Sequence, residues 1–83
     1  MHILEKLENV FLTEIAVDLG KKSLDPGEDL LEQGILDSIG IMKLIVFIEE
    51  NFGIKVEDEE IIPENFQSLS SMVTFVGQKM QNK

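Results

Sequence analysis

The sequence predicts an all-α fold: a four-helix bundle with three longer helices, one short helix and a long first loop. Apolar residues recur at spacings of three and four along residues 3–19, 38–52 and 69–80, which is the period of an amphipathic helix. Helices of this length are only marginally stable alone, so the three are expected to bury their apolar faces together. The 83 residues suit one small domain, which we expect to span residues 1–83.

The first helix is expected to run from about Ile3 to Leu19, and Gly20 ends it. No helical period persists from there to the next helix, and so long a connection needs side chains that anchor it to the core. The expected anchors are Leu24, Leu30, Leu31, Ile35 and Leu36. A calcium-binding loop at residues 25–32 is excluded, because its residues do not follow the ligand order of an EF-hand.

The second helix begins where an aspartate is followed by a serine. Asp37 is a good N-cap, because its carboxylate can accept hydrogen bonds from the first backbone N–H groups of the helix. Ser38 then lies in the first turn, where the partial positive charge of the helix N-terminus favours a phosphate. The serine hydroxyl is therefore a candidate attachment point, although a plain helix cap would use the same two residues.

Two apolar stripes run along this second helix. The stripe expected to face the core contains Ile41, Leu44, Ile45, Ile48 and Phe52. Ile39, Met42 and Val46 form a second stripe beside it, which exceeds what a small core usually needs. This second stripe serves either a wider core contact or the docking of a partner, for which a methionine is well suited.

The C-terminal third is expected to contain a short helix near residues 58–62 and the last long helix. The acidic run Glu57–Glu60 is interpreted as the solvated start of the short helix rather than a metal site, and Pro63 as its end. Residues 64–67 are expected to form a loop anchored by Phe66.

The last helix is expected to be capped by Ser68 or Ser70. Its apolar period predicts a buried face of Leu69, Met72, Val73, Val76 and Met80.

The composition excludes several classes of function. Sixteen acidic and seven basic residues give a net charge of −9, which argues against nucleic acid and anionic membranes. The charge either favours partners with basic surfaces or only confers solubility. With no cysteine and one histidine, His2, neither a catalytic triad nor a multi-histidine or thiolate metal site is expected. No apolar window is long enough for membrane insertion, and no signal pattern is present. We therefore expect a soluble, cytoplasmic, monomeric protein without a bound metal.

A set of short motifs is spread along the chain in a fixed order. They are Asp29-Leu30, Gly34, Asp37-Ser38-Ile39, Leu44 and Ile48, the run from Glu49 through Phe52-Gly53-Ile54-Lys55-Val56, and the Ser68 start of the last helix. With these motifs and its order of elements, almost the whole chain resembles the acyl carrier proteins and their aminoacyl- and peptidyl-carrier relatives. Asp-Ser-Ile alone is a weak signal, but in combination with the glycine before it and the Glu-x-x-Phe-Gly-Ile run after it the resemblance is specific.

The resemblance implies that Ser38 carries a 4′-phosphopantetheine arm, added from coenzyme A by a phosphopantetheinyl transferase with Mg²⁺. The thiol of the arm would hold an acyl or aminoacyl group as a thioester, and the chain itself would catalyse nothing. It also implies that Asp37 helps to position the serine and that Ile39 contacts the arm or a partner. The implied docking surface for the transferase, an acyl- or aminoacyl-activating enzyme and downstream acyl-transfer enzymes comprises Met42, Lys43, Val46, Glu49 and Glu50.

The chain departs from the carriers of fatty-acid synthesis at two positions of the second helix. Those carriers usually have acidic residues just after the Asp-Ser motif, where this chain has Gly40 and Lys43. The run Gly-Ile-Leu-Asp-Ser-Ile is more similar to stand-alone carriers that serve adenylating enzymes, including D-alanyl carriers. We therefore expect a dedicated carrier. A glycine costs a helix about 1 kcal/mol relative to alanine, which favours a close approach of another segment at Gly40.

Two other functions compete for Ser38. A serine hydrolase needs Gly-x-Ser-x-Gly, and Leu36 occupies the place of the first glycine while the one histidine is His2. A helical adaptor that has the carrier fold but is never modified is compatible with the helical pattern, although such an adaptor has no need of the serine.

Overall fold

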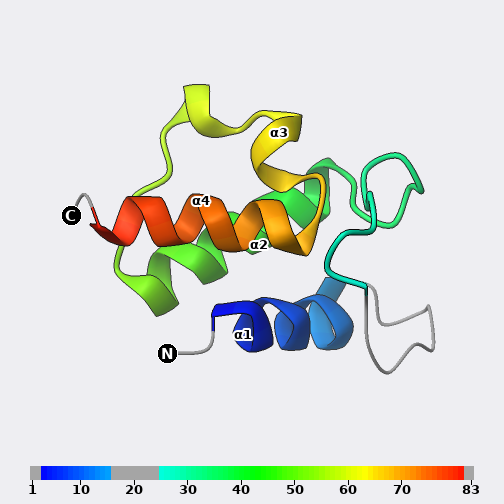
Figure 1. Cartoon of the computed structure of the whole chain (residues 1–83), viewed down its shortest axis with the longest axis horizontal. Coiled ribbons are helices and arrows are strands. Elements are labelled where there is room, and N and C mark those ends of the chain that lie inside the picture. Colours follow the sequence, from blue (N-terminus) through cyan, green and yellow to red (C-terminus); the bar gives the residue numbers. More distant parts are fainter. Residues whose placement is uncertain (1–2, 16–24, 82–83) are drawn as a thin grey trace.

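The computed structural model describes residues 3–15 and 25–81, and every regular element in these ranges is a helix or a helical turn (Figure 1). The longer helices are α1 (Ile3–Val10), α2 (Ser38–Phe52) and α4 (Leu69–Gln81). The shorter elements are a π-helical turn η1 (Phe11–Ile15), a 3₁₀ turn η3 (Asp58–Glu60) and the helix α3 (Pro63–Phe66). The predicted all-α bundle of three longer helices and one short one is confirmed.

The first predicted helix changes its geometry part-way. It is α-helical to Val10 and continues as the π-helical turn η1 to Ile15. Its predicted end at Gly20 and the predicted anchor Leu24 lie outside the described residues.

The bounds predicted for the short helix are wrong. The 3₁₀ turn η3 ends at Glu60, and Pro63 begins α3 instead of ending a helix. Pro63 occupies the first helical position, where its missing N–H is not needed and its fixed φ already suits a helix. Three of the four residues predicted as a loop therefore form a helical turn, and Phe66 within it is buried as expected.

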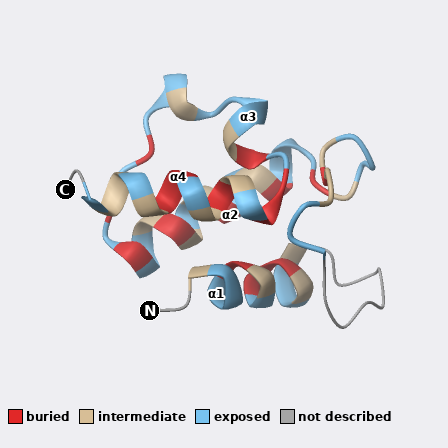
Figure 2. Ribbon diagram, viewed as in Figure 1, coloured by how far each residue is buried: buried red, intermediate tan, exposed pale blue. Residues whose placement is uncertain are grey.

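The core lies where α1, α2, α3 and α4 meet. α1 and α3 both pack against α4, and α2 contacts α1, η1 and α4. Buried residues lie along the sides of these helices that face one another (Figure 2). The core side chains are Leu7, Val10, Phe11, Leu30, Leu36, Leu44, Ile48, Phe52, Ile54, Val56, Phe66, Leu69, Met72, Phe75 and Val76.

The predicted buried stripes are mostly confirmed. In α2, Leu44, Ile48 and Phe52 are buried, whereas Ile41 and Ile45 are partly buried against the core. In α4, Leu69, Met72 and Val76 are buried and Val73 and Met80 are partly buried. Ser68 caps α4, because its Oγ accepts the Ser71 N–H at 3.1 Å.

The loop before α2 is fastened to the junction of α3 and α4 by backbone hydrogen bonds. The Leu30 N–H donates to the Gln67 carbonyl at 2.7 Å, and the Ser70 N–H donates to the Pro26 carbonyl at 2.9 Å. Leu30 and Leu36 are buried, as predicted for anchors. The chain therefore enters α2 from a fixed direction.

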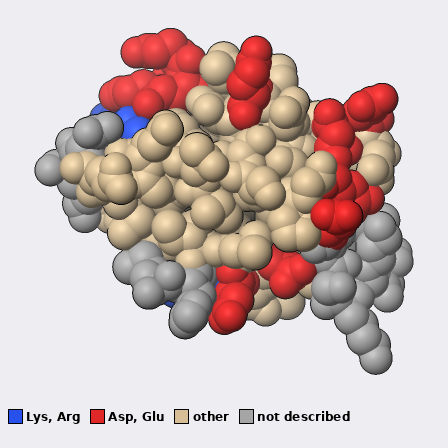
Figure 3. All heavy atoms as spheres, viewed as in Figure 1, with Lys and Arg blue, Asp and Glu red and all other residues tan. Residues whose placement is uncertain are grey.

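The surface is strongly acidic. Acidic side chains lie around the edge of the face shown in Figure 3, and little basic surface is visible there. Within the ranges 3–15 and 25–81, no helix has both the length and the apolar character that crossing a bilayer requires.

Candidate functional site

The start of α2 is held by its aspartate cap. Asp37 has extended backbone angles, and its Oδ1 accepts the Gly40 N–H at 2.8 Å. The Asp37 carbonyl accepts the Ile41 N–H at 2.9 Å, which is the first helical hydrogen bond. The predicted cap is confirmed. Ser38 is therefore the first residue of the helix, and it is exposed.

Gly40 lies under two neighbouring segments. A Cβ atom at this position would lie 2.8 Å from Leu36 Cδ1, closer than carbon atoms pack, and a tight 3.1 Å from Ile15 Cγ2. The close approach expected from the sequence is confirmed. The absence of a side chain lets the preceding loop and η1 pack directly against the first turn of α2, on the side opposite the solvent.

The reversal of the chain before this turn depends on another glycine. Gly34 has φ +75°, a conformation that residues with a side chain rarely adopt. After it, the N–H groups of Ile35 and Leu36 both donate to the Leu30 carbonyl, at 3.0 and 3.1 Å. These bonds aim the chain at Asp37, and they explain why a glycine stands four residues before the serine.

Ile39, Met42 and Val46 form an exposed apolar surface along α2, which we call the α2 strip. Their exposed fractions are 64%, 67% and 54%, and these values rule out a wider core contact. The strip begins directly beside Ser38. Its use for docking stays a prediction.

The charged residues predicted for docking differ in their surroundings. Lys43 and Glu50 are exposed, and Lys43 Nζ donates to the Glu14 backbone carbonyl at 3.4 Å. Glu49 is partly buried, and its Oε2 accepts the Val56 N–H at 2.9 Å. That bond holds the link after α2, so the Glu49 carboxylate has a role inside the fold that the sequence did not indicate.

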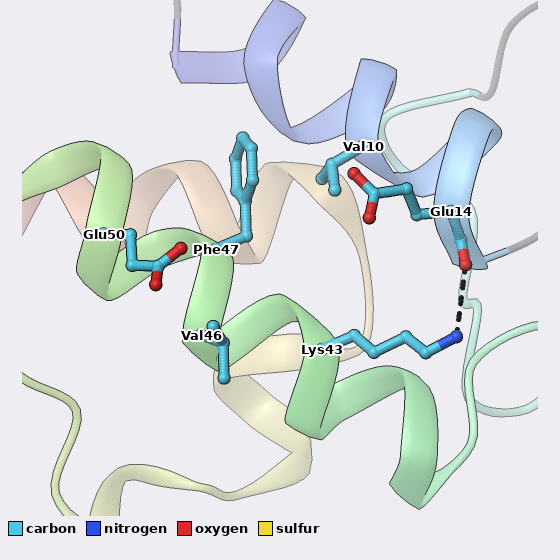
Figure 4. A pocket seen from close by; sticks show the side chains of 6 residues that line it. All are labelled: Val10, Glu14, Lys43, Val46, Phe47 and Glu50. Atoms are coloured by element: carbon cyan, nitrogen blue, oxygen red, sulfur yellow. Dashed lines mark hydrogen bonds between the residues drawn. The ribbon is translucent and has the colours of Figure 1, made fainter.

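A groove lies between α1–η1 and α2, and we call it the α1–α2 groove (Figure 4). Its volume is about 330 Å³, and it is lined by Val10, Glu14, Lys43, Val46, Phe47 and Glu50. Val10, Glu14 and Phe47 were not singled out from the sequence. The available signal was Phe47, an aromatic residue in the middle of the second helix that belongs to neither predicted stripe.

The acidic turn η3 is held by a hydrogen-bonded ion pair. Lys79 Nζ donates to both carboxylate oxygens of Glu60, at 2.8 and 3.1 Å, and the Glu57 N–H donates to Glu60 Oε1 at 2.9 Å. These donors, the Lys79 ammonium first, lower the pKa of the Glu60 carboxyl below its usual value. In the described part of the chain no cluster of acidic or histidine side chains could hold a metal ion.

Comparison with known proteins identifies the family. The model of the family "Phosphopantetheine attachment site" matches residues 5–76. The chain belongs to this family, that of the acyl carrier proteins. It is a carrier domain with a covalently attached phosphopantetheine, and the family is not catalytic.

Several carriers are similar to this chain over most of its length. A "Probable acyl carrier protein PigG" of a Serratia species is 34% identical, covering 84% of this chain and 84% of that protein. A "D-alanyl carrier protein" of Streptococcus pyogenes is 30% identical, covering 86% and 81%. The solution structure of a holo acyl carrier protein from Nitrosomonas europaea is 32% identical, with a TM-score of 0.74 and coverage of 98% and 99%.

The start of α2 fits the family's prosthetic group. A phosphodiester link needs a reachable hydroxyl, and Ser38 is exposed at the end of a 15-residue helix whose N-terminus favours a phosphate. Ser68 is buried and its Oγ is already hydrogen-bonded to Ser71. Of the other described serines, Ser70 is exposed but its helix is already capped at Ser68.

Proposed function

We propose that Ser38 is the residue that carries the phosphopantetheine arm. The observation that supports this most is the exposed hydroxyl of the first α2 residue, directly after a cap whose carboxylate is fixed at 2.8 Å from the Gly40 N–H. The arm supplies a thiol that holds an acyl or aminoacyl group as a thioester. The chain presents that thiol from a rigid helix end and has no cysteine of its own.

The attachment reaction transfers the phosphopantetheine group from coenzyme A to the Ser38 hydroxyl, as in other phosphoryl-type transfers. The Ser38 oxygen forms a bond to the phosphorus of the phosphopantetheine portion of coenzyme A, and the bond from that phosphorus to the pyrophosphate oxygen breaks. The leaving group is adenosine 3′,5′-bisphosphate, and a base of the transferase takes the serine proton. Asp37, held by the hydrogen bond that its Oδ1 accepts, fixes the direction of the helix start, and its other carboxylate oxygen would be a ligand for the Mg²⁺ of the transferase.

The test is a modification assay with coenzyme A, Mg²⁺ and a broad-specificity phosphopantetheinyl transferase. The unmutated protein should gain the mass of one phosphopantetheine group, and Ser38→Ala should gain none. The matched control is Ser70→Ala, another exposed serine near a helix start, which should be modified normally. Circular dichroism should show both variants folded, because Asp37 caps α2 and Ser68 caps α4. Modification of the Ser38→Ala protein would refute the assignment.

We further propose that the whole chain, residues 1–83, acts as one monomeric carrier domain with a dedicated acyl- or aminoacyl-activating enzyme. The support is the composition of the surface beside Ser38, where the α2 strip is apolar and Lys43 is positive. An enzyme adapted to acidic side chains on this helix would meet a like charge, and like charges at an interface cost several kcal/mol. The similarity to an acyl carrier protein and to a D-alanyl carrier protein is compatible with such a role.

A carrier that is never modified, serving as a helical adaptor, is the alternative. It has no specific support in the structure, because an adaptor would leave the exposed Ser38 without a purpose.

A further inference from the structure

The α1–α2 groove combines an apolar wall with a charged mouth. Val10 is buried and Phe47 is partly buried, and with Val46 they form the apolar part of the groove. Glu14 and Glu50 are both exposed at its edge (Figure 4). The groove lies along α2 next to the α2 strip, and Val46 belongs to both.

The charges of the groove are unbalanced. Among the described residues neither the Glu14 nor the Glu50 carboxylate has an ion pair, while the Lys43 ammonium is directed to the Glu14 backbone carbonyl at 3.4 Å. Two carboxylates against the single ammonium of Lys43 leave the groove net negative, and a negative mouth beside an apolar wall is complementary to a ligand with a cationic group next to an apolar side chain. An aminoacyl thioester has this chemistry, because its carboxyl is consumed in the thioester and its α-ammonium remains. A fatty acyl group has no cationic group, so it would contact only the apolar wall of the groove.

We propose that the α1–α2 groove is a resting site for an apolar aminoacyl group carried on the arm of Ser38, an inference that rests on the proposed attachment. Val46 is eight residues beyond Ser38 on the same helix, which at the rise of an α-helix is about 12 Å. The extended arm is longer than this separation.

Because the aminoacyl group is tethered to the protein, even the weak binding of a shallow groove is sufficient to hold it. A ligand on a short flexible linker has an effective concentration of about 1 mM at a site within reach, so binding of millimolar strength populates the groove substantially. Because Val46 lies in both surfaces, a partner that docks on the α2 strip would meet the aminoacyl group at the edge of its own interface.

The test compares two cargoes that differ by one group. The protein is loaded, through coenzyme A analogues with an amide in place of the thioester, with an L-leucyl group or with a 4-methylpentanoyl group. Both have the same carbon skeleton, and only the first has the α-ammonium. The readout is the change of backbone and methyl NMR signals relative to the protein with an unloaded arm.

The leucyl form should shift the signals of Val10, Val46 and Phe47, and the 4-methylpentanoyl form should shift them roughly 1.4- to 5-fold less, the range expected for exposed ion pairs. Glu14→Gln and Glu50→Gln should lower the leucyl shifts toward the 4-methylpentanoyl level. Glu59→Gln, which removes an exposed carboxylate that does not line the groove, should leave them unchanged.

Equal shifts from the two cargoes, or a leucyl form whose groove signals match those of the unloaded arm, would overturn the inference. The intact mass of each loaded sample separates this outcome from a failure of the attachment. If Ser38 carries no arm, the proposed function fails. If the arm is present and the groove is unperturbed, only the resting site fails.

Discussion

The two faces of α2 are both apolar, but only one of them is used for folding. Leu44, Ile48 and Phe52 are at most 4% exposed, whereas Ile39 and Met42 of the α2 strip are more than 60% exposed. Fully burying a side chain of this size stabilises a protein by about 1.5–3 kcal/mol, so three side chains that are 54–67% exposed forgo roughly 3–6 kcal/mol. One face of this helix is therefore explained by the core, and the other is left exposed for the docking that we propose.

The largest expected effect separates the two faces by stability. Leu44→Ala removes a fully buried side chain and should lower the free energy of unfolding by about 2–5 kcal/mol. Met42→Ala, two residues earlier and 67% exposed, should change it by about 0.5 kcal/mol or less. Urea unfolding followed by circular dichroism measures both. Equal losses would show that the strip is part of the core.

An effect of intermediate size is expected from a mutation that tests which partner enzymes the exposed face of α2 recognises. Lys43→Glu restores an acidic residue where carriers of fatty-acid synthesis have one, and should raise malonyl transfer by the malonyl transferase of that pathway about tenfold, the equivalent of about 1.4 kcal/mol. Lys55→Glu, an exposed charge reversal outside α2, controls for net charge. Changing Gly40 to aspartate is unsuitable here, because its Cβ would collide with Leu36.

The transfer assay also bears on the dedicated role itself. If the unmutated protein is malonylated as fast as that pathway's own carrier, the dedicated-carrier proposal is wrong, and the protein belongs to ordinary fatty-acid synthesis.

The smallest expected effect comes from the Lys79–Glu60 ion pair, a surface contact that, unlike the α2 strip, contributes to the stability of the fold. Lys79→Met removes the donor that lowers the Glu60 pKa, and should cost about 1 kcal/mol or less at neutral pH. A lowered carboxyl pKa stabilises the fold above the pKa of the unfolded chain, and this stability is lost as the pH falls through the folded pKa. The stability difference between the two proteins should therefore shrink as Glu60 is protonated in acid. A difference that is independent of pH would contradict this role of the ion pair.

The sequence predicted the features that depend on local chemistry. The cap at Asp37 and the buried positions four residues apart in α2 follow from rules that act within one turn of a helix. The close packing at Gly40 was also predictable, because a glycine inside a helix needs a reason.

The features that the sequence did not predict depend on segments meeting in space. The carboxylate of Glu49 was assigned to a partner but accepts the Val56 N–H, a bond that exists only once the chain has turned at the end of α2. The α1–α2 groove needs Val10 and Phe47 from two helices, and no spacing within either helix places them together. The role of Pro63 was ambiguous in the sequence, because a proline can either end or begin a helix. In the structure it begins α3, the helix that buries Phe66.

The most direct test of the central claim is the intact mass of the protein purified from its own cells, followed by fragment masses that locate any modification. We expect a chain that is heavier by one phosphopantetheine group. The added mass should lie on the fragment that contains Ser38 and be absent from the fragment that contains Ser68, Ser70 and Ser71. An unmodified mass would support the adaptor alternative, and an arm on any other residue would contradict the assignment of Ser38.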